Sequence, residues 1–213
     1  MEERTSGIIL RTRPLTETSL VVQWLTPDLG RIFTVAKGAR RPKSPFLGKL
    51  DLFYAADFSF ARSLRSELHN LREVIVCDAH VGLREDIGRL NQASYFAVLL
   101  EKSTEPEAPI SELHELLSEA LAHLTRKAPA EEAVFVFELK LLCALGYEPN
   151  FDSLADAIRN SGNAAIDDPF ATAVDGLSLL KPGEKGALNR FLQRSIGTAL
   201  EKVPPQRERA LTI

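Results

Sequence analysis

The chain has 213 residues, of which 45% are apolar and 26% are charged, a composition typical of globular proteins and not of disordered or fibrous ones. No run of about 18 apolar residues occurs, which excludes a membrane-spanning helix. The acidic start MEERTSGIILRTR is unlike a secretory signal. Cys77 and Cys143 lie in apolar runs far apart, which predicts small buried side chains, no disulfide and a cytoplasmic location.

The net charge of −3 hides an uneven distribution. Residues 1–50 hold nine Lys and Arg against four Asp and Glu, a net charge of +5, so the remainder carries −8. A basic front on an acidic body predicts that the front meets a polyanion. A basic loop that is merely solvated is the alternative.

Residues 1–80 have the pattern of a β domain. Thr26-Pro27-Asp28-Leu29-Gly30 predicts a tight turn in which Gly30 has positive φ. In LDLFYAADFSFA the period-2 pattern places Leu52, Tyr54, Phe58 and Phe60 on one face, with Asp57 and Ser59 opposite. The expected strands are 7–13, 18–26, 30–38, 50–61 and 66–77. Five short strands favour a closed barrel of the oligonucleotide-binding (OB) type.

Residues 81–213 have helical periodicity, so the expected fold class is α+β: an OB barrel followed by a mostly helical domain. Helices are expected over 83–103, from Ser111 with Glu112 in its first turn, over 130–146 and from about 188 to Pro204. The third is apolar nearly all round and predicts a central buried helix that ends at Gly146. Residues 149–182 predict an irregular region with one short helix, loops and one strand pair.

Signatures of catalysis and of metal binding are missing from the sequence. Gly48-Lys49 lacks the glycine and the hydroxyl residue of a phosphate-binding P-loop. The four histidines form no ligand-spaced pair, and the acids between 152 and 175 match no calcium loop. Two cysteines are too few for a cysteine-based zinc site. The sequence therefore predicts a binding protein with no metal and no cofactor.

The segment KGARRPKSPF, residues 37–46, carries four cations and no acid, with Pro42 and Pro45 limiting its flexibility. Gly38 is expected to take positive φ. Cations neutralise phosphates and aromatic rings stack on bases, so the barrel has the parts of a nucleic-acid site. Core packing is the alternative for the aromatics. The candidate phosphate contacts are Arg11, Arg13, Arg31, Lys37, Arg40, Arg41, Lys43 and Lys49, and the candidate stacking residues are Trp24, Phe33 and Tyr54.

RTRPLTETSLVVQWLTPDLGRIFTVAKGARRPKS resembles the N-terminal segment of the bacterial DNA repair protein RecO family. The matching elements are Glu17-Thr18-Ser19, Gly30-Arg31 and Val35-Ala36-Lys37-Gly38-Ala39-Arg40. A second block, FELKLLCALGYEPNF at 137–151, is similar to the central helix of that family and its Leu-Gly-Tyr ending. Both blocks keep the family order, so the resemblance covers most of the chain.

The resemblance implies a non-enzymatic protein that binds single- and double-stranded DNA and anneals complementary strands in the bacterial cytoplasm, at the nucleoid during repair. It implies action with RecR to load RecA onto DNA coated by single-stranded-DNA-binding protein (SSB). A contact with the acidic, hydrophobic SSB tail is implied on the helical domain. By charge alone, Arg126, Lys127 and Lys140 are its candidate residues.

The sequence departs from the family in one region. Many members carry a four-cysteine zinc module after the Leu-Gly-Tyr block, whereas residues 149–182 here contain no Cys and no His. Two other interpretations stay open from the residues alone. One is an OB module that binds RNA, and the other is a scaffold whose basic loop grips an acidic partner protein.

Overall fold

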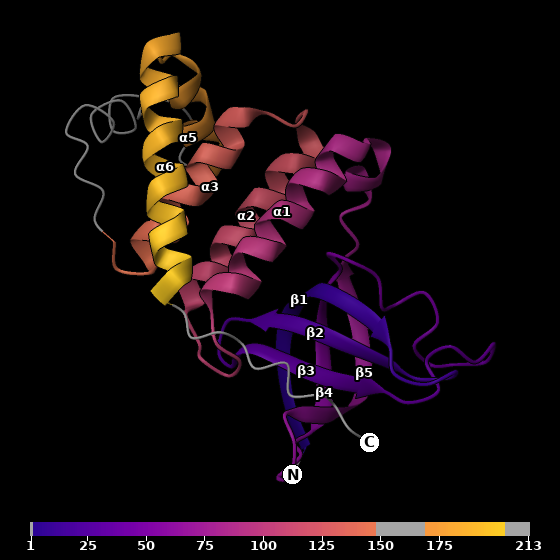
Figure 1. The fold of residues 1–213 in the computed structure, drawn as a ribbon. Helices are drawn as coiled ribbons and strands as arrows, with labels where there is room; N and C mark the ends of the chain where they lie inside the picture. Colours follow the sequence, from indigo (N-terminus) through magenta and orange to yellow (C-terminus); the bar gives the residue numbers. More distant parts are fainter. Residues whose placement is uncertain (1, 148–168, 203–213) are drawn as a thin grey trace.

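The computed structural model describes residues 2–147 and 169–202. The five strands form a closed barrel in the order β1-β2-β3-β5-β4, which confirms the expected OB-type architecture. Figure 1 shows the barrel on one side of the molecule and the helices stacked on the other. The strands are β1 Glu2–Pro14, β2 Leu20–Thr26, β3 Gly30–Ala36, β4 Ala55–Ala61 and β5 Leu68–Asp78.

The long first strand closes the barrel by pairing with two neighbours. Its first half runs antiparallel to β4 from Glu2 to Ile8, and its second half pairs with β2 as far as Pro14. β3 and β5 then pair in parallel through Phe33 and Leu68. Closure leaves no sheet edge open to pair with another chain.

The barrel interior follows the predicted alternation, with two local differences. β4 begins at Ala55 and not at residue 50, because Phe53 takes positive φ (65°) and interrupts the extended chain. Phe58 and Phe60 are buried and Asp57 is exposed, while Ser59, predicted on the same face as Asp57, is also buried. Its neighbours on the adjoining strands, Arg4 and Glu73, form an ion pair (3.8 Å) across it.

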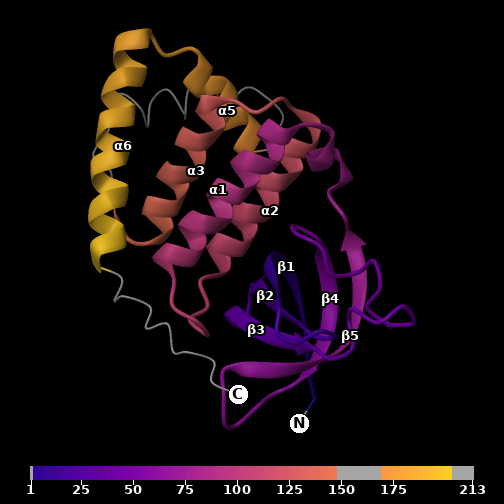
Figure 2. The ribbon, with the colours of Figure 1, turned by 45° about the vertical axis from the view of Figure 1, so that its right-hand side comes forward.

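The helices begin directly after the barrel. Figure 2 shows α1, α2 and α3 side by side, with α6 on the far side from the barrel. α3 contacts α1, α2, α5 and α6, which confirms the predicted central helix. The elements are a 3-10 helix Val81–Glu85, α1 Ile87–Ser103, α2 Ser111–Arg126, α3 Glu131–Ala144, α5 Pro169–Ser178 and α6 Pro182–Lys202. None of these described helices is long and apolar enough to cross a membrane.

Glycine ends α3 as the sequence predicts. Gly146 has φ 81°, and its N–H donates to the Cys143 carbonyl at 2.9 Å. The Tyr147 N–H donates to the Leu142 carbonyl, also at 2.9 Å. These two bonds satisfy carbonyls that would otherwise be left unpaired at the helix end.

The predictions for the two cysteines and for residues 149–182 have different outcomes. Cys77 and Cys143 are both exposed, so the prediction of buried thiols is wrong. Cys77 is two residues after the exposed Ile75 in β5, so both side chains point to the same, solvated face of the sheet. Within 149–182, the predicted short helix is α5, while residues 149–168 lie outside the described part of the chain.

One hydrophobic core is shared by the barrel and the helices. The barrel contributes four residues of its outer side, which pack with buried residues of α1, α2 and α3: Ile8, Leu10, Leu25 and Phe53. The connection between α1 and α2 lies on β3, where Pro106 forms a bridge with Arg31. The barrel and the helices therefore form one packed unit.

The close approach at Gly30 gives a testable prediction. Gly30 and Gly48 have similar positive φ values (67° and 72°), but an added Cβ at Gly30 would lie 2.5 Å from the Ala108 carbonyl oxygen, while at Gly48 it would meet nothing within 4 Å. Gly30→Ala should therefore lower the free energy of unfolding by about 1–3 kcal/mol more than Gly48→Ala, as measured by urea denaturation. Equal losses would contradict this contact.

Candidate nucleic-acid interface

The basic segment lies in the connection between β3 and β4, residues 37–54. It is a succession of hydrogen-bonded turns, in which the N–H groups of Arg41, Ser44 and Leu47 each donate to the carbonyl three residues earlier (3.0–3.2 Å). Gly38 has φ 71°, which confirms the predicted positive value. Ala39 and Phe46 are 7% exposed and anchor the connection in the barrel core. The cations therefore sit on a fixed loop.

This basic loop is joined to the β1–β2 loop. The Arg40 N–H donates to the Thr18 carbonyl (3.0 Å), and the Arg40 guanidinium donates to the Thr16 carbonyl (3.4 Å). Arg13 lies at the end of β1, beside the same loop. The two loops therefore form one surface at one end of the barrel. Glu17 is the acidic residue of the β1–β2 loop.

Six of the eight candidate cations gather at this end, and none of them forms an ion pair with a described residue. Lys49 is half-buried and the other five are exposed. We call these six residues the cationic surface: Arg13, Lys37, Arg40, Arg41, Lys43 and Lys49. Unpaired cations close together repel one another, and an external polyanion relieves that repulsion.

Arg31, one of the eight candidate phosphate contacts, is not available at the surface. Its side chain is 1% exposed, so the expectation that it contacts phosphate is wrong for this structure. Its Nε donates to Thr104 Oγ1 (3.0 Å) and its Nη2 to the Thr104 carbonyl (2.7 Å). Burial lowers the pKa of Arg31, and the negative charge of Glu101 opposes that shift. An arginine stays charged at neutral pH, so Arg31 is a buried charge that these partners satisfy.

Arg11 is exposed, but its guanidinium already forms an ion pair with a carboxylate. Its guanidinium forms a two-point contact with Glu101 of α1, at 3.1 and 2.8 Å. The Gln23 amide lies between Glu101 and Arg31, in the orientation in which its nitrogen donates to Glu101 (3.1 Å) and its oxygen accepts from Arg31 (3.0 Å). Arg11, Gln23 and Arg31 thus hold the helices against the barrel.

The three candidate aromatics have different surroundings. Trp24 is fully buried, stacks on Phe58 with 4.0 Å between ring centroids, and donates its indole N–H to Thr34. The stacking role expected for Trp24 is therefore wrong for this structure, because the ring belongs to the barrel core. Phe33 and Tyr54 are half-buried and keep part of their surface open.

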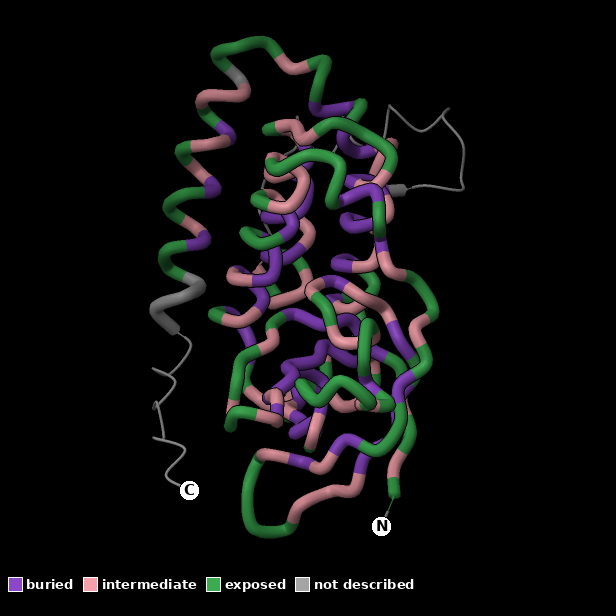
Figure 3. The backbone as a smooth tube through the Cα atoms, turned by 90° about the vertical axis from the view of Figure 1, so that its right-hand side faces the viewer, coloured by how far each residue is buried: buried purple, intermediate pink, exposed green. Residues whose placement is uncertain are grey.

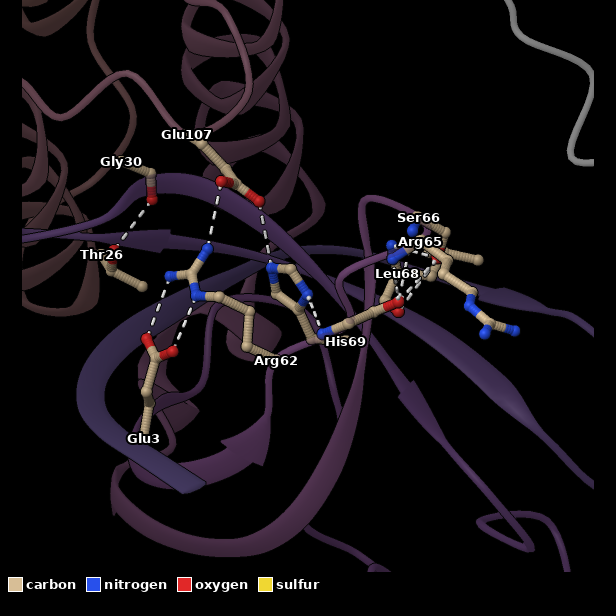
Figure 4. Close-up of polar contacts among 10 residues, drawn as sticks. Glu3, Thr26, Gly30, Arg62, Arg65, Ser66, Leu68, His69 and Glu107 are labelled. Carbon is tan, nitrogen blue, oxygen red and sulfur yellow. Dashed lines mark hydrogen bonds and ion pairs between the residues drawn. The ribbon is translucent and has the colours of Figure 1, made fainter. Parts of the chain in front are cut away.

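A second group of charged residues, which the sequence analysis missed, fixes the connection between α1 and α2. Glu107 accepts from Arg62 (3.1 Å) and lies 3.1 Å from His69 Nε2, and Arg62 also contacts Glu3 at 2.7 and 3.0 Å (Figure 4). The Ser63 N–H donates to His69 Nδ1, so Nε2 carries the hydrogen and donates to Glu107. Hydrogen bonding to Arg62 lowers the pKa of Glu3.

The helical candidates do not form one cluster. Lys140 pairs with Glu119 (2.7 Å) and lies over the Phe170 ring. It is nine residues along α3, about 13 Å from the helix start, whereas Arg126 and Lys127 precede that start. A shallow hollow of about 370 Å³ opens at the start of α3, and Pro129 in its lining is two residues after Lys127. The lining residues are Gly88, Asn91, Gln92, Tyr95, Pro129, Ala130, Glu131 and Val134.

Within residues 2–147 and 169–202, no group of three or more His, Cys, Asp or Glu side chains is placed to hold a metal ion. Figure 3 shows buried backbone running through the centre of both the barrel and the helices, with exposed positions on the outside.

Comparisons with known proteins identify the family. Residues 1–80 match the family model "Recombination protein O N terminal", and residues 84–210 match "Recombination protein O C terminal". The chain belongs to the RecO family. The family is one of DNA repair and recombination, as the resemblance in the sequence indicates.

Relatives carry the name DNA repair protein RecO. The protein from Bacillus pumilus (strain SAFR-032) is 30% identical over 159 residues, which cover 75% of this chain and 61% of that protein. The protein from Alkaliphilus metalliredigens (strain QYMF) is 32% identical over 163 residues, 76% of this chain and 65% of that protein. A Listeria monocytogenes serotype 4b protein is 27% identical over 91% of this chain. The match thus spans less than two thirds of the first two relatives.

The buried position of Arg31 gives the second prediction. Arg31→Met would remove the guanidinium that donates to Thr104 Oγ1, to the Thr104 carbonyl and to the Gln23 side-chain oxygen, so the free energy of unfolding should fall by about 2–4 kcal/mol. Arg41→Met makes the same chemical change at an exposed, unpaired site and should change stability by no more than about 0.5 kcal/mol. Urea denaturation of both variants measures the difference. Equal stabilities would contradict the structural role of Arg31.

Proposed function

We propose that the chain is a non-enzymatic DNA-binding protein of recombinational repair, which binds single- and double-stranded DNA through the cationic surface. The observation that supports this most directly is that the cations without carboxylate partners gather at one end of an OB barrel on a loop fixed by turns. OB barrels commonly bind oligonucleotides across their second and third strands and adjoining loops.

The helices restrict where a strand of DNA can lie. Gln23 and Arg31, on the outer side of β2 and β3, are covered by Glu101 and Thr104 of the helical part. The opposite end, at Arg13 and the basic loop, is left for a ligand. A bound strand therefore crosses the loop end of the barrel, where Tyr54 supplies a partly open ring for base stacking. Phe33 is a weaker candidate, because it lies opposite Gln23 with the Arg31 guanidinium 5.8 Å from its ring centre.

Annealing follows from the same surface. Neutralising the phosphates of two complementary strands lowers the repulsion between them, and stacking without sequence preference leaves the base edges available for pairing. With RecR, the protein would help RecA load onto SSB-coated DNA. This activity belongs to the cytoplasm, at the nucleoid, and requires neither catalysis nor a cofactor.

The third prediction tests the cationic surface with single-stranded DNA in a salt series. Six phosphate contacts give a slope of log affinity against log salt of about −4, and Arg40→Glu/Arg41→Glu/Lys43→Glu should reduce it to about −2 or less. The affinity of the triple variant for single-stranded DNA at low salt should also be lower than that of the wild type. Fluorescence anisotropy with a labelled oligonucleotide measures both quantities.

A matched control separates local contact from net charge. Lys102→Glu/Arg190→Glu/Arg194→Glu makes the same change in net charge at exposed helical positions. If both triple variants lose the same affinity, the basic loop has no special role. RNA competing as well as DNA would favour an RNA-binding module, and no affinity for either would favour a scaffold for an acidic protein.

The SSB tail is assigned to the hollow at the start of α3. An acidic, hydrophobic tail needs an apolar surface and a base. Tyr95, Pro129 and Val134 line the hollow, and Lys127 is an exposed base two residues before Pro129 in the chain. Lys140 is a weaker candidate because Glu119 already neutralises it.

The fourth prediction tests this assignment. Lys127→Glu should weaken binding of a labelled SSB tail peptide about fivefold at low salt, because one attractive surface charge becomes repulsive. Val134→Glu, which places a charge in the hollow, should weaken it further. Lys102→Glu reverses an exposed charge elsewhere and should bind as the wild type does. Unchanged binding in both test variants would exclude this hollow.

A further inference from the structure

A second hollow lies under the cationic surface. It has a volume of about 270 Å³ and lies between the start of β2 and the basic loop. Its lining side chains are mainly apolar, while polar atoms make up as much of its surface as apolar atoms do. The lining residues are Leu20, Ala39, Phe46, Leu47, Gly48, Leu50, Asp51 and Tyr54. Arg40 and Lys49 are immediate chain neighbours of lining residues, so the backbone of two residues of the cationic surface passes beside the cavity.

The Tyr54 ring is held in place before any ligand arrives. Its backbone carbonyl accepts from the Ile9 N–H at 3.0 Å, which fixes the residue to β1. The Arg84 guanidinium lies 5.1 Å from the centre of the ring and is itself held by Asp51 (2.9 Å) and the Leu52 carbonyl (3.1 Å). Arg84 does not line the hollow, so one side of Tyr54 is supported by a cation while the ring lines the cavity.

The chemistry of the hollow differs from that of its surroundings. A phosphate is stabilised by the cations on the loop but loses hydration in an apolar cavity next to the Asp51 carboxylate. A nucleobase has an apolar, flat face that stacks on an aromatic ring, and its amino groups donate to a carboxylate. The volume is below the about 300–1,000 Å³ typical of sites for drug-sized ligands, which suits a single ring system.

We infer that this hollow receives one unstacked nucleobase of a bound single strand, with an exocyclic amino group directed at Asp51. The inference rests on the proposed DNA binding and adds a base site to it. The phosphates of the same strand lie on the cationic surface, while one base leaves the stack and enters beside Tyr54. Cytosine, adenine and guanine carry the amino group, and thymine does not.

The experiment compares oligo(dC) with an abasic strand of equal length, which has the same phosphates and no bases. The purified full chain should bind oligo(dC) more tightly. Tyr54→Ala and Leu47→Ala should each lose affinity for oligo(dC), by at least about fivefold for Tyr54→Ala, and keep their affinity for the abasic strand. Leu47 is 66% exposed, so its replacement leaves the core intact. Leu64→Ala changes a leucine that is 97% exposed outside the hollow and should behave as the wild type does.

The role of Asp51 has its own comparison. Wild type should prefer oligo(dC) to oligo(dT), and Asp51→Asn should reduce that preference about threefold to tenfold, the effect of one hydrogen bond. Arg84→Gln removes the partner of Asp51 without changing the carboxylate and should keep the preference. If Arg84→Gln loses the preference as fully as Asp51→Asn, the direct contact between Asp51 and the base is overturned.

The outcomes separate this inference from the proposed function. If the wild type binds oligo(dC) and the abasic strand equally, DNA binding stands and the base site is overturned, which leaves the hollow to a side chain of a protein partner. If it binds neither strand, DNA binding itself fails and the base site with it. A loss on oligo(dC) alone, confined to Tyr54→Ala and Leu47→Ala, supports the base site.

Discussion

The buried guanidinium of Arg31 is the constraint on which the arrangement of the molecule depends. It extends from the start of β3 and binds the chain just after α1 through two contacts with Thr104. A buried charge that loses its partners is strongly unfavourable, so the barrel and helices cannot part without a large loss of stability. Gln23 and Glu101 extend the same network to Arg11 on the surface.

This docking also divides the cations of the basic front end into two groups. Arg11 and Arg31 bind the Glu101 carboxylate and the Thr104 carbonyl of the helical part and stabilise the fold, and Arg4 pairs with Glu73 of β5. The cations at the loop end of the barrel form no ion pair with a carboxylate among the described residues and stay available. The acidic helical part thus neutralises the end of the barrel on which it packs, and the charge that remains is concentrated at the other end.

Local patterns were sufficient to predict most of the fold, but only part of the site. The positive φ at Gly30, Gly38 and Gly146 follows from turn and helix-end chemistry within a few residues, and the barrel follows from strand periodicity. Arg31 could not be separated from the exposed cations, because its partner Thr104 is 73 residues away. Trp24 has the same β pattern whether its ring faces the core or a ligand.

The sequence by itself determined the order of elements, the family and the stretch that carries unpaired charge, because these depend on residue type and short-range spacing. Tertiary structure alone decided which of those charges meet a partner. Burial and ion pairing depend on what packs over a side chain, and here the covering residues Glu101, Thr104 and Glu107 come from the helical part. The hollow beside Tyr54 likewise depends on tertiary packing, because Ala39 and Phe46 of its lining belong to the barrel core.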